Sequence, residues 1–262
     1  MPYCNSRSNT KGLSHAAEVN SINLSLPFKL GSVNCYLIKT HDDYILIDTG
    51  GSNKRADLEK ELISAGCQPG HLTLIVITHG DFDHIGNAAY LRQKFGAKIA
   101  MHGDDVGMAE RGDMFWNRKK GNRLLRSLAP SLFRFGAADR FQPDAIVADG
   151  ADLTEYGFDA KVLSIPGHSK GSIGILTSAG DLFCGDLLEN TKQPSISTIM
   201  DDMPTAQVSI EKLESTNVTV YPGHGKPFPL KLLLQKRLRS IFTDKRYRFL
   251  ILPCEGGGFR GF

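Results

Sequence analysis

Short runs of apolar residues, separated by turns rich in glycine and polar side chains, make up the first part of the chain. Runs of this kind are typical of strands, and the short connections between the first three favour antiparallel pairing. After them, Ala56, Leu58 and Leu62 recur at helical spacing. The predicted elements are strands at 23–28, 34–39 and 44–48, a helix at 53–65, a strand at 72–77, a helix at 85–95 and a strand at 98–101.

A second β-rich half follows further along the chain. Its pattern predicts strands at 160–165 and 218–221, a hairpin of strands at 172–177 and 181–184, and a helix at 204–215. Each sheet must bury its apolar face against another layer. The expected fold class is therefore α+β, a four-layer αββα sandwich with two sheets face to face and helices outside.

Residues 104–142 interrupt this alternation of strands and helices. Leucine and phenylalanine are interleaved with arginine across 122–135, which indicates amphipathic helices, broken at Pro130 because proline cannot donate a backbone hydrogen bond. We interpret the segment as a helical insertion over a site, although an ordinary pair of surface helices fits the pattern equally well. The expected organisation is an N-terminal tail at 1–21, a domain at 22–228 that contains the insertion at about 104–142, and a basic C-terminal extension at 229–262.

Charge and cysteine content narrow the class of protein. The chain has 262 residues, 23% of them charged, and a formal net charge of +3, so its total charge gives no strong nucleic-acid signal. The five cysteines are widely spaced without a Cys-x-x-Cys pair, which disfavours a disulfide framework or a thiolate zinc site. No run approaches the roughly 18 apolar residues of a membrane span and the start lacks an apolar signal segment, so we predict a cytoplasmic protein.

A dense group of metal-type side chains follows the predicted strand at 72–77. Residues 78–84 read Thr-His-Gly-Asp-Phe-Asp-His, so two imidazoles and two carboxylates are crowded together. At the end of a buried strand they would lose hydration, and the carboxylates would repel each other, unless a cation compensated them. A helix cap with surface carboxylates is the alternative interpretation of this segment alone. The candidate ligands here are His79, Asp81, Asp83 and His84.

Three further candidates each stand directly after a glycine at the end of an apolar stretch. They are His168 in a Pro-Gly-His segment, Asp186 in a Cys-Gly-Asp segment and His224 in a second Pro-Gly-His segment. Histidine and aspartate at junctions of strands and loops are suited to metal binding. The chain thus offers seven candidate ligands at such junctions.

In this order, the motifs resemble those of the metallo-β-lactamase superfamily of metallohydrolases. In that family a His-x-His-x-Asp-His motif follows a strand, and a later Gly-His, a bridging aspartate and a final Gly-His complete a two-metal site. The segments at 34–37 (Asn-Cys-Tyr-Leu) and 47–50 (Ile-Asp-Thr-Gly) are also similar to the family. The resemblance covers about residues 22–228.

The resemblance implies a role for each candidate. Asp81 stands where the family usually has its second histidine, which places an oxygen donor in a nitrogen position. Two divalent metal ions are expected, with zinc favoured and iron or manganese as alternatives because of Asp81. Asp81 could also remain unligated, which would leave one site weakly occupied. By analogy, one ion would be held by His79, Asp81 and His168, the second by Asp83, which is also the expected catalytic residue, with His84 and His224, and Asp186 would bridge them.

Counting charges shows what Asp81 changes. Two divalent ions contribute +4, three aspartates −3 and a bridging hydroxide −1, which sums to zero, whereas histidine at position 81 would leave +1. A less positive centre is a weaker Lewis acid towards an anionic substrate and is better suited to iron or manganese.

The leading hypothesis is a binuclear metal-dependent hydrolase that uses a metal-bridging hydroxide on a small ester, thioester, lactone or amide. No side-chain nucleophile is then needed, in keeping with a sequence that has no Gly-x-Ser-x-Gly motif. Basic residues outnumber acidic ones across 111–140, which would suit an anionic small molecule such as a glutathione or coenzyme A conjugate.

Two other enzyme classes on this scaffold are alternatives. Some diiron relatives carry a carboxylate at the position of Asp81, and persulfide dioxygenases use a single iron, so an iron-dependent oxidoreductase is the second hypothesis. The diiron enzymes, however, usually have an appended flavin-binding domain. A nucleic-acid phosphodiesterase is less favoured because the insertion lacks an RNA-binding signature.

Two residues outside the motifs are further candidates. Asp48 is expected either to orient a metal-binding imidazole by accepting its hydrogen bond or to cap the helix that follows. His102, at the end of a predicted strand, is a candidate for the rim of the substrate site, or else simply a partly exposed histidine.

Overall fold

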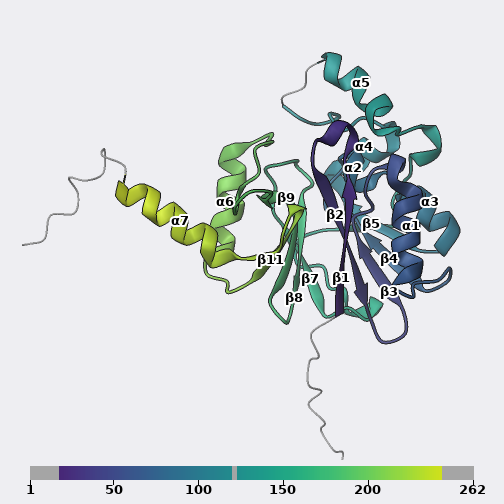
Figure 1. Ribbon diagram of the computed structural model, residues 1–262, viewed down its shortest axis with the longest axis horizontal. Coiled ribbons are helices and arrows are strands. Elements are labelled where there is room, and N and C mark those ends of the chain that lie inside the picture. The colour runs from purple at the N-terminus through teal and green to yellow at the C-terminus, as the bar shows by residue number, and fades with distance from the viewer. Residues whose placement is uncertain (1–17, 120–122, 244–262) are drawn as a thin grey trace, which may run out of the picture.

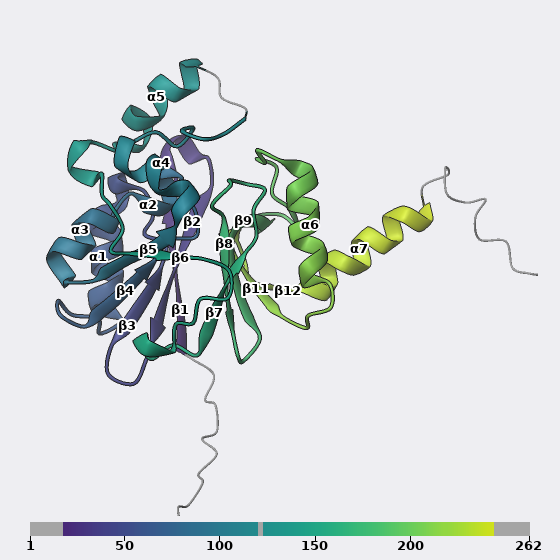
Figure 2. The same cartoon turned by 180° about the vertical axis from the view of Figure 1, so that it is seen from behind.

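Two β-sheets lie side by side, with helices on the outer side of each (Figure 1; Figure 2). The computed structural model describes residues 18–119 and 123–243. Within those two ranges, no helix combines the length and apolar character needed to cross a bilayer.

The first sheet contains the N-terminal strands in sequential order. Its first two pairings, β1 with β2 and β2 with β3, are antiparallel, and the pairings from β3 to β6 are parallel. β3 and β4 are almost wholly buried, as expected of strands covered on both faces. The strands are β1 (Glu18–Ser25), β2 (Ser32–Lys39), β3 (Tyr44–Ile47), β4 (Leu72–Val76), β5 (Lys98–His102) and β6 (Ala145–Val147).

Helices cover the outer face of this sheet. Leu58 and Leu62 of α1, together with Leu91 and Phe95 of α3, are buried in one apolar cluster with strand residues of the sheet. α3 ends at Gly96, whose φ of 78° gives the left-handed turn that commonly terminates a helix. The helices are α1 (Arg55–Ser64), α2 (Phe82–Ile85), α3 (Ala88–Phe95) and α4 (Val106–Arg111).

The second sheet contains the C-terminal strands in the order β12-β11-β9-β8-β7, with β10 paired to β9. β9 and β11 run parallel, so the residues near their carboxyl ends reach the same edge. The helices α6 (Met203–Leu213) and α7 (Leu230–Thr243) lie on its outer side (Figure 2). The strands are β7 (Ala160–Ser164), β8 (Ile173–Thr177), β9 (Asp181–Asn190), β10 (Ser195–Ile196), β11 (Thr219–Gly225) and β12 (Phe228–Pro229).

A separate apolar core joins the two sheets. Ile38, Ile45 and Val76 from the first sheet are buried in the same cluster as Val162 and Phe183 from the second. The outer helices pack on different clusters. The layers are therefore helix, sheet, sheet and helix, and the predicted αββα sandwich is confirmed.

Two of the predicted domain boundaries fall within elements that pair with or pack on the two sheets. β1 begins at Glu18 and pairs with β2 along its whole length, so residues 18–21 belong to the sheet and not to a tail. The predicted extension from 229 begins inside β12, and in the helix that follows, Leu230 and Leu233 are buried against the second sheet. The division into a tail, a domain and an extension stays a prediction, and residues 1–17 and 244–262 lie outside the described residues.

The predicted helix break at Pro130 is wrong. α5 (Arg123–Phe133) runs through this residue as one helix above the first sheet (Figure 1). The end of the helix is held by aromatic contacts, because the rings of Phe133 and Phe135 lie 6.4 and 4.5 Å from the ring of Phe82 in α2. Tertiary packing here outweighs the local cost of proline in a helix.

Candidate metal centre

One edge of the sandwich collects the candidate ligands. β4 leads directly into the segment that becomes α2, β7 leads into a loop, and β9 and β11 carry their ligands within the strands. Burial is nearly complete for all of them except His224, which is half-buried. The residues brought together are His79, Asp81, Asp83, His84, His168, Asp186 and His224.

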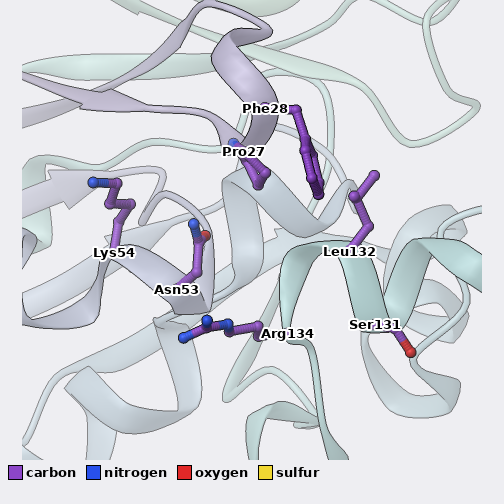
Figure 3. Close-up of a pocket in the computed structure, with 7 residues that line it drawn as sticks. All are labelled: Pro27, Phe28, Asn53, Lys54, Ser131, Leu132 and Arg134. Carbon is purple, nitrogen blue, oxygen red and sulfur yellow. The ribbon is translucent and has the colours of Figure 1, made fainter.

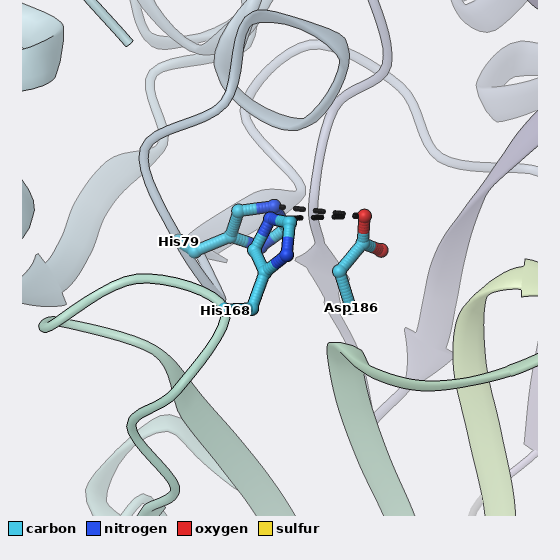
Figure 4. Close-up of side chains that lie close together, drawn as sticks. All are labelled: His79, His168 and Asp186. Atoms are coloured by element: carbon cyan, nitrogen blue, oxygen red, sulfur yellow. Dashed lines mark ion pairs between the residues drawn. The ribbon is translucent and has the colours of Figure 1, made fainter. Parts of the chain in front are cut away.

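His79, His168 and Asp186 form the first group of the centre (Figure 4). The Nε2 atoms of His79 and His168 lie 4.0 and 3.9 Å from Oδ2 of Asp186. Asp81 borders the same position, since its Oδ2 is 3.1 Å from Nε2 of His168 and 3.8 Å from Nε2 of His79. Ligands that each bind a zinc ion at about 2 Å lie at comparable distances from one another.

Asp83, His84 and His224 form the second group. The Nε2 atoms of His84 and His224 lie 3.9 and 3.6 Å from Oδ2 of Asp83. Asp186 also faces this group, with Oδ1 3.4 Å from Nε2 of His84 and Oδ2 3.1 Å from Nε2 of His224. Its carboxylate therefore lies between the two groups, where a bridging ligand would have to be.

The orientation of two histidines is set by backbone carbonyls. Nδ1 of His168 lies 2.6 Å from the carbonyl oxygen of Ile199, and Nδ1 of His224 lies 2.7 Å from that of Ser32. A carbonyl oxygen can only accept, so Nδ1 carries the hydrogen in both rings. Nε2 is then the nitrogen that faces the centre.

Asp48 and Thr78 orient the other two histidines. Oδ2 of Asp48 accepts hydrogen bonds from Nδ1 of His84 at 2.8 Å and from the hydroxyl of Thr78 at 2.7 Å. Because that hydroxyl has donated its hydrogen, it accepts from Nδ1 of His79, 2.9 Å away. The turn after β3 is instead capped by Gly51, without a side-chain hydrogen bond, so Asp48 is not a helix cap. All four imidazoles thus present Nε2 to the centre.

This donor set fits a divalent cation. Nε2 of His79, Nε2 of His84 and Oδ1 of Asp186 are buried, and no hydrogen-bond partner for them exists among the described residues. Burial, together with His84 and His168, lowers the pKa of His79 well below its usual value. Burial works to raise the pKa of Asp186, but His224 and His84 hold it well below its usual range. Burial works to lower the pKa of His84, His168 and His224, but the neighbouring carboxylates raise it. Metal binds neutral imidazole and ionised carboxylate, so a cation in the centre would take the place of protons on these rings.

Arg118, from the 104–142 insertion, also reaches the centre and was not predicted from the sequence. Its side chain is only 5% exposed, and its Nη2 lies 2.5 Å from Oδ1 of Asp81. Burial works to raise the pKa of Asp81, but the guanidinium of Arg118 and the ring of His168 hold it well below its usual range. Asp81 is therefore an ionised carboxylate that contacts both the buried guanidinium of Arg118 and His168 of the first group.

Asp105, also missed by the sequence analysis, ties together the loops that carry the ligands. Its fully buried carboxylate accepts hydrogen bonds from the amide of Gly80 at 3.0 Å, the hydroxyl of Ser169 at 2.6 Å and the amide of Gly171 at 2.9 Å. Gly80 follows His79, whereas Ser169 and Gly171 belong to the loop after β7. No sequence motif distinguishes this aspartate from its neighbour Asp104.

His102 is not part of either group. Its Nδ1 accepts a hydrogen bond from the amide of Asp104 at 3.2 Å and so caps the turn after β5. The proposed rim position of His102 remains a prediction.

A separate cavity of about 400 Å³ opens between the β1–β2 connection, the turn after β3 and α5 (Figure 3). Phe28 and Leu132 give it an apolar side, and Lys54 and Arg134 add two cationic side chains. Phe28 and Arg134 adopt left-handed backbone conformations, with φ of 55° and 54°. Nζ of Lys54 is paired with Oδ2 of Asp57 at 2.9 Å, so Arg134 provides the cationic side of the cavity.

The fold and the ligand arrangement together define the class of protein. Residues 29–224 match the model of the metallo-beta-lactamase superfamily, and the chain belongs to that family. The expected family is confirmed, while aspartate in place of the second histidine of the motif is not tested by this match.

Three similar proteins illustrate the range of the family. The chain is 30% identical over 168 residues to hydroxyacylglutathione hydrolase GloC of Haemophilus influenzae, covering 62% of this chain and 70% of that protein. It is 28% identical over 240 residues to the acyl-coenzyme A thioesterase MBLAC2 of Bos taurus, covering 81% and 79%. A solved structure, TTHA1623 in a di-iron-bound form, has a TM-score of 0.60 at 24% identity and covers 80% of this chain and 96% of that one. Family membership and the two hydrolases support an enzyme of the hydrolase class.

Proposed function

We propose that this protein is a binuclear metal-dependent hydrolase of a small ester, thioester, lactone or amide. The observation that carries the proposal is the common orientation of the four histidines, each of which has Nδ1 at an acceptor and Nε2 towards a carboxylate. Acceptors of this kind are the usual partners of metal-binding imidazoles, since they fix the ring and leave the other nitrogen free. A histidine cluster with a purely structural role would not need four such rings facing one point.

The residues of the chain would divide the work as follows. His79, His168 and Asp81 would hold one ion, while Asp83, His84 and His224 would hold the other, with Asp186 between them. When bound, two divalent ions supply an ionised water near neutral pH and polarise the oxygen of the substrate. Asp83, buried beside His84 and His224, is the carboxylate that we assign to catalysis as well as to binding.

We propose zinc as the metal, with iron or manganese as alternatives. Four imidazole nitrogens suit zinc, whereas the oxygen donor of Asp81 lowers the preference for it. An iron-dependent oxidoreductase is the second candidate function, and it is Asp81 beside the first group that favours it. The di-iron form of the neighbouring structure is a property of that protein alone and is no evidence for iron in this one.

We propose an anionic thioester or ester as the substrate class. Both named relatives act on conjugates of this type, glutathione in one and coenzyme A in the other. In this chain, the cationic Arg134 and the apolar Phe28 both line the cavity next to α5, while Lys54 at the same cavity is paired with Asp57. Such a wall would suit a ligand with both an anionic and an apolar part.

Metal analysis with a paired variant tests the proposal. Protein purified without added metal should contain up to two equivalents of a divalent ion and should hydrolyse S-lactoylglutathione, acyl-coenzyme A or 4-nitrophenyl acetate. His224→Ala should lower kcat/KM by roughly 100-fold or more, because it removes a ligand of the second group. His41→Ala, at an exposed histidine outside the centre, serves as the matched control and should change neither quantity. Oxygen consumption with iron bound would favour the oxidoreductase, and full activity after removal of all metal would refute both.

A further inference from the structure

The guanidinium of Arg118 lies directly beside the first group of candidate ligands. Its Nη2 lies 2.5 Å from Oδ1 of Asp81 and 3.3 Å from Nε2 of His168. Both residues are expected ligands of the same ion. Arg118 therefore contacts two members of the first group from within the protein, with only 5% of its side chain exposed.

The residues on either side of Arg118 fix its position. The side chain of Asn117 donates to the backbone carbonyl of Asp104. On the other side, the amide of Lys119 donates to Oδ1 of Asp201 at 2.8 Å, and its Nζ lies 2.5 Å from Oδ2 of Asp202. The segment is thus attached to the end of β5 and to the segment before α6, so the arginine is directed into the centre by contacts with both halves.

Arg118 and an ion at the first group would compete for Nε2 of His168. Its Nδ1 hydrogen is committed to the carbonyl of Ile199, so Nε2 is the only nitrogen available to an ion. The positively charged Nη2 of Arg118 lies 3.3 Å from the same nitrogen, which also lies 3.1 Å from Oδ2 of Asp81. A divalent ion in this position would be repelled by the guanidinium of Arg118 and would have to compete with it for His168.

The second group has no such neighbour. Among the described residues, Asp83 forms its close charge contacts with His84 and His224, and no lysine or arginine forms an ion pair with it. Within the described part of the chain, the ion pairs of Asp186 are likewise formed with histidines. The two halves of the centre are therefore chemically unequal.

We infer that Arg118 acts as a built-in competitor of the ion at the first group, so that the protein binds one ion tightly through Asp83, His84 and His224 and a second ion more weakly. The inference rests on the proposed metal centre and adds the order in which its two positions fill. Arg118 is a positioning residue in this scheme, because it acts through Asp81 and His168.

Zinc titration of the full-length protein after removal of metal by a chelator tests the inference. Competition with a chromophoric chelator resolves two stepwise dissociation constants, and the wild type should show two unequal steps. Arg118→Met, which keeps the length of the side chain but removes the charge and the donors, should strengthen the weaker step by at least about tenfold and leave the tighter step unchanged. Arg118→Lys, which keeps the charge, should strengthen it less.

Lys98→Met is the matched control, since it removes an exposed cation at the start of β5, outside the centre and outside the segment that holds Arg118, and both steps should remain as in the wild type. If Arg118→Met weakens the second step or leaves it unchanged, the inference is refuted, and Arg118 instead supports Asp81 as a ligand. Two equally tight steps in an active wild-type enzyme would refute this inference alone. Absence of zinc binding in all variants would refute the metal centre and the inference with it.

Discussion

Replacement of Asp105 by alanine should separate the two loops that carry the first group. The carboxylate is fully buried and accepts hydrogen bonds from Gly80 on one side and from Ser169 and Gly171 on the other. Gly80 belongs to the loop after β4 in the first sheet, and Gly171 to the loop after β7 in the second. Asp105→Ala therefore removes the only acceptor described for two buried backbone amides.

The magnitude follows from these contacts. A buried amide left without an acceptor costs about 1–3 kcal/mol, so the amides of Gly80 and Gly171 together cost about 2–6 kcal/mol. The hydroxyl of Ser169 adds little, because it can donate to Ser172, whose oxygen is 2.8 Å away. Burial raises the pKa of Asp105, so the buried, ionised carboxylate is unfavourable in free energy, and the alanine variant lacks this unfavourable contribution. The net loss in the free energy of unfolding should be about 2–4 kcal/mol.

Urea unfolding of the metal-free protein measures this loss, and zinc titration of the same variant should show weaker binding at the first group. Asp104→Ala is the matched control, since its side chain is 60% exposed and its ion pair is with His102, outside the centre, and it should change stability by less than about 0.5 kcal/mol. A loss below about 0.5 kcal/mol for Asp105→Ala would show that the two loops do not depend on this carboxylate.

Two further predictions concern other buried groups. Asp48→Asn should weaken zinc binding by roughly 10–100-fold in a chelator competition assay. Asparagine tolerates the left-handed backbone at φ 58°, but its amide nitrogen replaces an oxygen that accepts from His84 or Thr78. Unchanged zinc affinity would contradict the orienting role of Asp48. Burial raises the pKa of Cys67 and of Cys184 to about 12, so only a fraction on the order of 10⁻⁴ of either thiol is ionised at pH 8. Peptide mapping after iodoacetamide treatment should find both cysteines unmodified in the native protein and modified in urea. Rapid labelling of the native protein would contradict their burial.

Periodicity predicted the elements that bury a clear apolar face. The strands expected at 34–39 and 44–48 correspond to β2 and β3, and the helix expected at 53–65 corresponds to α1. The strands β6, β10 and β12 escaped prediction because two or three residues carry no recognisable period. β9 was expected to end at 184 but continues to Asn190 through Gly185 and Asp186, since its pairing with β11 tolerates register shifts that a sequence pattern does not reveal.

The candidate ligands could be selected from the sequence because their chemistry is unusual for strand ends. Histidine and aspartate directly after apolar runs need compensation when buried, and the four histidines could be identified on that basis. Their supporting acceptors could not. The carbonyl groups of Ser32 and Ile199 are backbone atoms, and any residue type at these positions would supply them.

Arg118 shows why a departure from a motif cannot be judged from the motif alone. In the proposed two-metal centre, the charge counted from two divalent ions, three aspartates and a hydroxide would fall from +1 to zero with Asp81 in place of histidine. The guanidinium of Arg118, 37 residues further along the chain, lies 2.5 Å from that carboxylate and returns the sum to +1. The pair thus matches the net charge of a neutral imidazole, but it differs in having hydrogen-bond donors that face His168. Asp81 and Arg118 therefore have to be treated as one unit, since either residue considered alone gives the wrong electrostatic character for the first group.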